Sequence, residues 1–137
     1  MATPTPEELF APVAHDLSAC GRTSRLVERS PDGGGPRLWR QLVVDSVPVG
    51  YLEFDVDLDT DVQVEIIAGH AQDAVLENLP SLTDSRAWPA CRPGHAHPMR
   101  LVPAAALDSD SGPRWVCPAD PSFRVPVGGH PGPLPQA

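Results

Sequence analysis

The sequence predicts an α+β fold in which two helices cover an antiparallel sheet of three to four strands, followed by a C-terminal hairpin. Apolar residues recur at helical spacing in 6–21 and in 69–82, whereas residues 51–67 alternate between apolar and mainly acidic side chains. These two patterns predict the helices and the sheet. The hairpin is predicted by two proline-containing turns, "CRPGHAHP" and "WVCP", which flank a run that can fold back on itself.

Two segments predict helices, one before and one after the strands. Residues 6–21 carry their apolar side chains on one helical face, and Gly21 suits the end of this helix. Pro12 lies inside the segment, so the helix either begins there or is kinked. Residues 69–82 repeat the spacing and end at Pro80. We expect one or both helices to cover the apolar face of the sheet.

The segment between the helices predicts strands. Residues 24–30 and 36–45 flank the turn sequence "PDGGG", which is typical of a β-hairpin. A second turn is expected at Asp45–Ser46. The alternation in 51–67 is typical of a strand with one buried face. This stretch is longer than a usual strand, so we expect a turn or a bulge near Asp59–Thr60.

Composition is compatible with one domain that contains long irregular stretches. The 137 residues include 18 prolines and 11 glycines, too many for a chain that is regular throughout. All ten basic side chains other than histidine are arginine. This usage is typical of the very GC-rich genomes of actinobacteria, a bias that also raises the proline and glycine counts.

Charge is divided unevenly along the chain. Residues 1–85 hold fifteen acidic residues and five arginines, a net charge of −10, whereas residues 86–137 hold three acidic residues and five arginines, a net charge of +2. A strongly acidic surface repels phosphate backbones and anionic membranes, which argues against direct binding of the first 85 residues to nucleic acid. The same surface suits a basic protein partner.

The sequence shows no feature of a secreted or membrane-spanning protein. Its first 17 residues lack the basic and apolar regions of a secretory signal, and no run approaches the length of a membrane span. We therefore expect a cytoplasmic protein. Its three cysteines should be reduced, and an odd number also argues against a disulfide framework. Reduced thiols are free to bind metal.

Four side chains of the C-terminal segment predict a metal site. The Pro93–Gly94 turn folds Cys91 back toward His95, and His97 lies two residues further on. Cys117 lies in the second turn, which a hairpin would bring to the first. Zinc prefers four ligands in a tetrahedron, commonly thiolate and imidazole. The four residues therefore predict a Zn²⁺ site, which would stabilise a segment with little core of its own.

Other interpretations of these residues stay open. The two cysteines also suit small buried apolar positions beside histidines in a solvated loop. If His97 does not reach the ion, His130 is the reserve ligand. A site with only three protein ligands would leave a position for water, as catalytic zinc sites do, with Asp108 or Asp110 as a weak candidate for the general base.

The segments "WPACRPGHAHP", "WVCP" and "VPVGG" resemble the C-terminal stretch of small, uncharacterised actinobacterial proteins, in which WP-x-C-x-x-H-x-x-H-P precedes W-x-C-P and an I/V-P-x-G ending. The resemblance covers about residues 74–129 and implies a zinc-ribbon-like module. The spacing here differs, being Cys-x3-His-x-His. We therefore expect an α+β domain in 7–82, a zinc-ribbon-like segment in 86–129, and flexible tails at 1–6 and 130–137.

The acidic residues of 51–67 form a row that comprises Glu53, Asp55, Asp57, Asp59 and Asp61. On a strand they would stand about 6–7 Å apart. This spacing suits a solubilising face paired with arginines of neighbouring strands, or the docking of an arginine-rich partner. A calcium site is the poorest match, because the glycine turn and the closing glutamate of calcium loops are missing.

The remaining reactive and aromatic residues have structural interpretations. Cys20 is expected to be a packed thiol, because His15 faces away from it on the helix. His70 is expected on the surface. Trp88 and Trp115 each stand just before a candidate ligand and are expected to pack over the metal site. The sequence contains no phosphate-binding loop, dinucleotide fingerprint or nucleophile elbow.

Three functions are compatible with these features. The first is a small non-enzymatic zinc-binding interaction protein that acts through an acidic sheet face as an adaptor, an inhibitor of the immunity or antitoxin type, or an accessory subunit. The second is a small zinc-dependent hydrolase or transferase with an open metal position. The third is a nucleic-acid-binding zinc ribbon, whose basic face would comprise Arg86, Arg92, Arg100, Arg114 and Arg124. The acidic charge disfavours the third, and the sequence favours the first.

Overall fold

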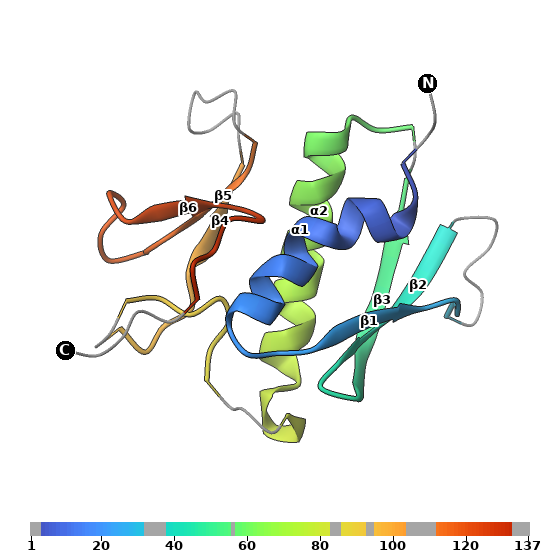
Figure 1. The fold of residues 1–137 in the computed structure, drawn as a ribbon, viewed down its shortest axis with the longest axis horizontal. Helices are drawn as coiled ribbons and strands as arrows, with labels where there is room; N and C mark the ends of the chain where they lie inside the picture. The colour runs from blue at the N-terminus through green and yellow to red at the C-terminus, as the bar shows by residue number, and fades with distance from the viewer. Residues whose placement is uncertain are drawn as a thin grey trace.

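The computed structural model describes residues 4–31, 38–55, 57–82, 86–92, 95–103 and 112–132. Its helices are α1 (Pro6–Ala19) and α2 (Thr60–Glu77), followed by a short 3-10 helix at Leu79–Ser81. The first antiparallel sheet consists of β1 (Ser24–Val27), β2 (Leu38–Val44) and β3 (Val47–Phe54). The second consists of β4 (Arg100–Val102), β5 (Arg114–Val116) and β6 (Arg124–Pro126). The helices lie between the two sheets, so the α+β class is confirmed (Figure 1).

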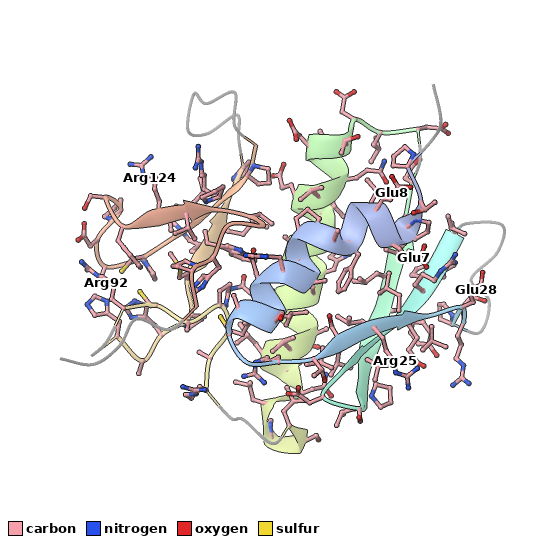
Figure 2. The ribbon with its side chains drawn as sticks, in the orientation of Figure 1. Glu7, Glu8, Arg25, Glu28, Arg92 and Arg124 are labelled. Carbon is pink, nitrogen blue, oxygen red and sulfur yellow. The ribbon has the colours of Figure 1, made fainter. Side chains whose placement is uncertain are left out.

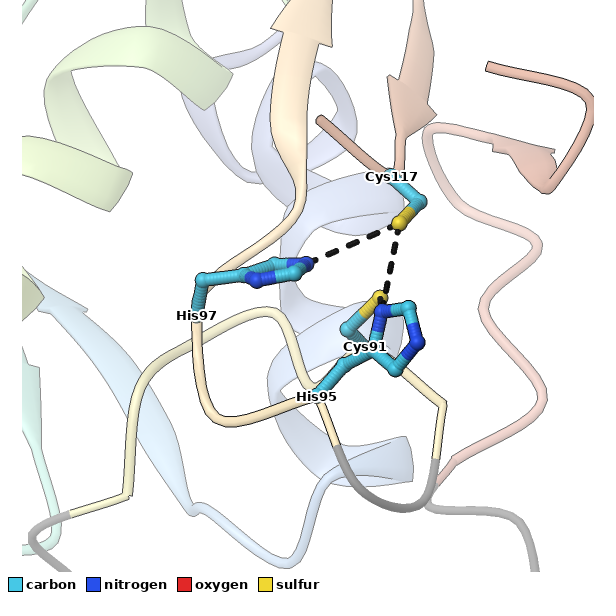
Figure 3. Close-up of side chains that lie close together, drawn as sticks. All are labelled: Cys91, His95, His97 and Cys117. Carbon is cyan, nitrogen blue, oxygen red and sulfur yellow. Dashed lines mark hydrogen bonds between the residues drawn. The ribbon is translucent and has the colours of Figure 1, made fainter. Parts of the chain in front are cut away.

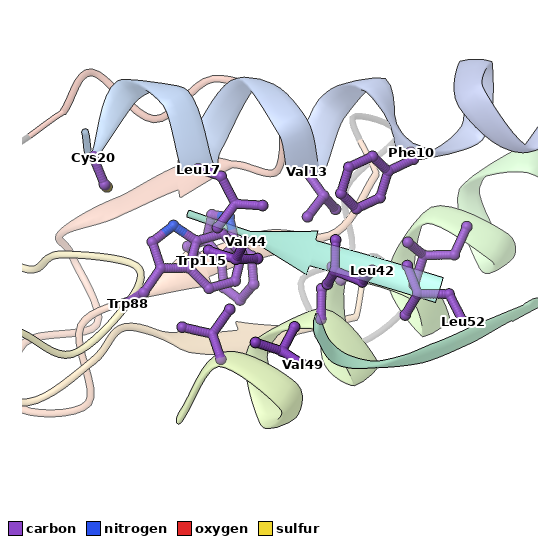
Figure 4. Packing of buried hydrophobic residues seen from close by; sticks show 14 of the residues in the cluster. Phe10, Val13, Leu17, Cys20, Leu42, Val44, Val49, Leu52, Trp88 and Trp115 are labelled. Atoms are coloured by element: carbon purple, nitrogen blue, oxygen red, sulfur yellow. The ribbon is translucent and has the colours of Figure 1, made fainter. Parts of the chain in front are cut away.

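Helix α1 begins at a capping box rather than at Pro12. The hydroxyl of Thr5 accepts a hydrogen bond from the backbone N–H of Glu8 at 3.1 Å, and the Glu8 carboxylate accepts one from the backbone N–H of Thr5 at 3.4 Å. Pro6 occupies the first turn, where its missing N–H is not needed. The helix continues through Pro12, because its apolar face is buried against the first sheet on both sides of that residue (Figure 4).

The first sheet is built from the predicted hairpin and turn. Strand β1 pairs with β2, with Leu26 opposite Leu42. The connection from β2 to β3 is the two-residue turn at Asp45 and Ser46, whose φ angles are 51° and 68°. Positive φ at both central residues matches the right-handed twist of the strands it joins. Part of the loop between β1 and β2, residues 32–37, lies outside the described residues.

The prediction that residues 51–67 form strands is wrong beyond Phe54. Helix α2 begins at Thr60, so it contains the last part of this stretch, 60–67, together with most of the second predicted helix, 69–82. Two patterns overlap here. Residues 60–77 also satisfy helical spacing, and this spacing determines which side chains are buried, namely Gln63, Val64, Ile67, Ala68, Ala71 and Val75.

The predicted acidic sheet face is therefore not formed. Among the five acids of the row, Glu53 lies in β3, and Asp61 lies in the first turn of α2, where a carboxylate complements the helix dipole. Asp55, Asp57 and Asp59 lie in the connection between these elements. The acids gather around one end of the strand and the beginning of the helix instead of forming a line.

One apolar core joins the two halves of the chain. The buried cluster includes residues of α1, the first sheet and α2 together with Trp88, Met99 and Trp115 of the C-terminal half (Figure 4). The two tryptophan rings meet edge to face, with centroids 5.4 Å apart. The boundary between 7–82 and 86–129 stays a prediction.

Charged side chains lie at both ends of the molecule. Figure 2 shows Glu7, Glu28 and Arg25 on the side of the first sheet and Arg92 and Arg124 on the side of the second. Arg40 pairs with both acids, at 3.5 Å from Glu7 and 3.4 Å from Glu28. In the described part of the chain, neither helix has the length and apolar character needed to cross a lipid bilayer.

Candidate metal centre

Backbone hydrogen bonds shape the two turns that carry the candidate ligands. The N–H of His95 donates to the carbonyl of Arg92 at 3.0 Å, which closes the turn that brings His95 back toward Cys91. In the second, the N–H of Asp120 donates to the carbonyl of Cys117 at 3.3 Å. Each turn therefore brings its ligands to the end of a strand of the same sheet.

The antiparallel pairing of β4 with β5 brings these turns together. Arg100 stands opposite Val116, so the residues that precede β4 lie beside those that follow β5. The antiparallel pairing agrees with the predicted return of the chain, whereas the zinc-ribbon-like character of the hairpin stays a prediction. Strand β6 adds a third member, which the sequence analysis missed. It pairs with β5, with Trp115 opposite Val125.

The structure brings Cys91, His95, His97 and Cys117 to one point (Figure 3). One donor atom from each of the four lies within 4.8 Å of all the others. The Cys117 sulfur is 3.5 Å from Nδ1 of His95 and 3.6 Å from Nε2 of His97, and the Cys91 sulfur is 3.8 Å from Nδ1 of His95.

These separations fit a tetrahedral ion. Bonds of about 2.3 Å to sulfur and about 2.0–2.1 Å to nitrogen at tetrahedral angles place sulfur and nitrogen about 3.5–3.6 Å apart. Two of the three sulfur–nitrogen distances above fall in this range, and the third is slightly longer. The four side chains therefore make up a possible metal site, and both histidines reach it.

The two thiols of the cluster have different acidities. For Cys117, burial favours the neutral thiol, but hydrogen bonds from His97, from the backbone N–H of Ala119 and from Cys91 outweigh it and lower the pKa to about 6. For Cys91, burial raises the pKa above its ordinary value. Because metals bind the thiolate, Cys117 is the better prepared of the two ligands at neutral pH.

An ion pair and a cation–ring contact outside the cluster join the two turns. The guanidinium of Arg92 lies 3.1 Å from the carboxylate of Asp120 and stacks over the ring of Phe123 at 5.1 Å. The Asp120 carboxylate also accepts hydrogen bonds from the N–H and the hydroxyl of Ser122, which lower its pKa. These contacts connect the loop before β4 to the loop between β5 and β6.

Asp16 of α1 holds the same region from the core side, and no pattern in the sequence identified it. Its carboxylate accepts hydrogen bonds from the indole N–H of Trp115 at 2.8 Å and from the backbone N–H groups of Gly128 and His130 at 2.7 and 2.9 Å. The backbone carbonyl of Asp16 accepts the indole N–H of Trp88 at 3.2 Å. The only feature of the sequence that could have identified Asp16 is that it is an aspartate among the apolar residues of a helix.

The other candidates from the sequence lie away from the cluster or outside the described residues. His130, the reserve ligand, is 3% exposed, although the sequence analysis placed it in a flexible tail. Its ring contacts the carbonyl of Ala90 at 2.7 Å and the sulfur of Cys20 at 3.7 Å. Burial raises the pKa of the Cys20 thiol, as suits a packed cysteine. Asp108 and Asp110 lie outside the described residues.

Comparison with known proteins gives no relative on which to base a function. No protein-family model, curated protein or solved structure matches this chain. The resemblance to the actinobacterial proteins therefore stays a prediction, and the function has to be argued from the site.

Proposed function

We propose that the protein is a small, non-enzymatic zinc-binding interaction protein. In this proposal Cys91, His95, His97 and Cys117 hold one Zn²⁺ ion, and the ion fixes a zinc-ribbon-like segment against the helical core. The observation that carries the proposal is the convergence of four donor atoms to within 4.8 Å of one another.

The donor set supports zinc over other common metals. Two sulfurs and two imidazole nitrogens in a compact, tetrahedral arrangement suit zinc, whereas calcium and magnesium prefer oxygen ligands. A knuckle-like turn at each side of the site and the three-stranded sheet β4–β5–β6 also suit a zinc ribbon. When bound, the ion would supply a cross-link between two turns that are 20 or more residues apart in the chain.

Four protein donors support a structural role for the ion. Catalytic zinc sites have three protein ligands and keep the fourth position for water or substrate. Here both histidines and both cysteines approach the same point, so four protein ligands would complete the tetrahedron. A small zinc-dependent hydrolase, the alternative function, would need one of these four side chains to stand away from the ion.

The acidity of the chain supports a basic partner. The acids of residues 53–61 do not form a row on the sheet but gather where β3 ends and α2 begins. Such an acidic surface is complementary to a cationic protein, which suits the role of an adaptor, an inhibitor of the immunity or antitoxin type, or an accessory subunit. The zinc-bound segment would then stabilise the domain that presents it.

The test is metal analysis of the full chain purified without chelator, combined with X-ray absorption at the zinc edge. We expect about one zinc per chain, bound by two sulfurs and two nitrogens. Cys117→Ser should lose the metal, whereas the matched variant Cys20→Ser should retain it. Absence of zinc would overturn the metal site. An oxygen ligand from water in place of one of the four side chains would favour the hydrolase.

A further inference from the structure

Two side chains of α2 and one just before it are aliphatic and exposed. Leu58, just before the helix, is 40% exposed, and Val62 and Ile66, at successive four-residue steps, are 40% and 39% exposed. Single exposed aliphatic residues are common on protein surfaces, but Val62 and Ile66 are four apart on α2 and therefore neighbours on its surface. Leu58 lines the same hollow as Ile66, and we call the three residues the stripe.

A hollow of about 170 Å³ lies beside this stripe, between α2 and the end of β3. Its walls include Glu53 and Asp55 from the strand side, and Gln63, Ile66 and His70 from the helix. The hollow thus has an apolar wall continuous with the stripe and an acidic wall opposite. We call the stripe and the hollow together the α2 groove.

One polar group on the wall of the groove lacks a partner. Gln63 is 3% exposed, and its Nε2 donates to the carbonyl of Leu58 at 3.1 Å. Its Oε1 receives no hydrogen bond from any group in the described ranges. A buried acceptor without a donor destabilises the folded state. A ligand that donates an N–H at this wall would recover that free energy.

The charge around the groove selects the kind of donor. Asp55 lines the hollow, and no arginine is among the described residues that line it. Three further acids, which are exposed, lie in the chain on either side of the lining residue Leu58 or at the beginning of α2, namely Asp57, Asp59 and Asp61. A cationic donor is therefore attracted, and an anionic one is repelled. Arginine fits better than lysine, because its planar guanidinium can donate at once to a carboxylate and to a neighbouring amide oxygen.

We propose that the α2 groove binds a short amphipathic segment of a partner protein, with aliphatic side chains on the stripe and an arginine directed at Asp55 and Gln63. An apolar row at helical spacing beside a hollow is the surface onto which an amphipathic helix packs. This inference rests on the proposed function as an interaction protein and names the surface and the chemistry of the partner.

The test uses the full, metal-loaded chain and a fluorescent synthetic helix of about 18 residues, with leucine on one face and arginine on its flanks. Binding is followed by anisotropy. Ile66→Arg and Asp55→Asn should each weaken binding by about tenfold or more. Leu38→Arg is the matched control, because Leu38 is similarly exposed, at 37%, but does not line the hollow. It should change binding by less than about twofold.

Three results would overturn the inference. The first is unchanged binding in Ile66→Arg, and the second is equal binding of a peptide with glutamate in place of arginine. The third is a dimer of the chain alone that Ile66→Arg dissociates, which would make a second copy the occupant. Zinc content is measured in the same samples. If the unmodified chain contains zinc but does not bind the peptide, the groove alone is rejected. If the unmodified chain binds the peptide specifically but contains no zinc, the metal site alone is rejected.

Discussion

Replacement of Asp16 by asparagine tests whether the carboxylate on α1 holds the C-terminal segment. The side chain is fully buried, and its two oxygens accept three N–H groups, from Trp115, Gly128 and His130. Asparagine keeps one oxygen and turns an N–H₂ group toward the remaining donors. Because Oδ2 accepts two of the three bonds, one or two buried N–H groups lose their acceptor, at about 1–3 kcal/mol each. We expect a loss of about 3 kcal/mol in the free energy of unfolding.

The assay is urea unfolding with zinc in excess, followed by circular dichroism. Asp73→Asn is the matched control, because Asp73 is an exposed aspartate on a helix and its replacement should change the free energy of unfolding by less than about 0.5 kcal/mol. The double variant Asp16→Asn/Trp115→Phe should lose less free energy of unfolding than the sum of the losses in the two single variants, because both substitutions remove the same hydrogen bond. Additive effects, or an Asp16→Asn variant as stable as the control, would refute this role for Asp16.

Three further predictions follow from contacts around the site. Arg92→Ala should weaken zinc binding only a few-fold in chelator competition, because its ion pair and ring contact are partly exposed; a loss of two orders of magnitude would contradict this. In the metal-free chain, stability should fall as pH decreases from 9.0 to about 6, because folding lowers the pKa of Cys117 and the unfolded state binds more protons in that range. Urea titrations of Cys117→Ser should lack this dependence. In thermal unfolding, Gly132→Ala should destabilise the protein by about 2 kcal/mol more than Gly21→Ala. Both glycines have positive φ, but only at Gly132 would the new Cβ lie 2.6 Å from a backbone oxygen, that of Ala19. Equal losses of stability in the two variants would contradict the predicted clash.

Local signals predicted part of this fold because they act within one element. The helical face of 6–21, the hairpin of β1 and β2 and the turn at Asp45–Ser46 all formed as expected. The error at 60–67 arose because alternating and helical spacing share several positions there. The structure exposes Val62 and Ile66 and buries Ile67 and Ala68 in the core, which fits helical spacing and not alternation. Burial is a tertiary property that spacing alone does not determine.

The candidate metal site was predicted better than the residues that support it. Cysteine and histidine near turn-forming prolines are rare enough to be noticed in a sequence, and the structure places all four together. Asp16 and His130 give no such signal. They stand 114 residues apart, and the hydrogen bond between them depends on how the C-terminal segment packs on α1. Strand β6 was missed for a similar reason, because three residues are too few to show a periodic pattern.

Because the turns that carry the ligands are attached to the core, the metal would contribute less to folding than it does in an isolated zinc finger. In an isolated zinc finger, binding of the ion provides the free energy that orders the whole peptide. Here each turn follows a buried tryptophan, and both indole N–H groups donate to Asp16, so α1 already holds Trp88 and Trp115. We therefore expect the core to order most of the segment before any ion is bound. Less of the binding free energy is then consumed in folding, and the metal stabilises mainly the two turns that contain its ligands.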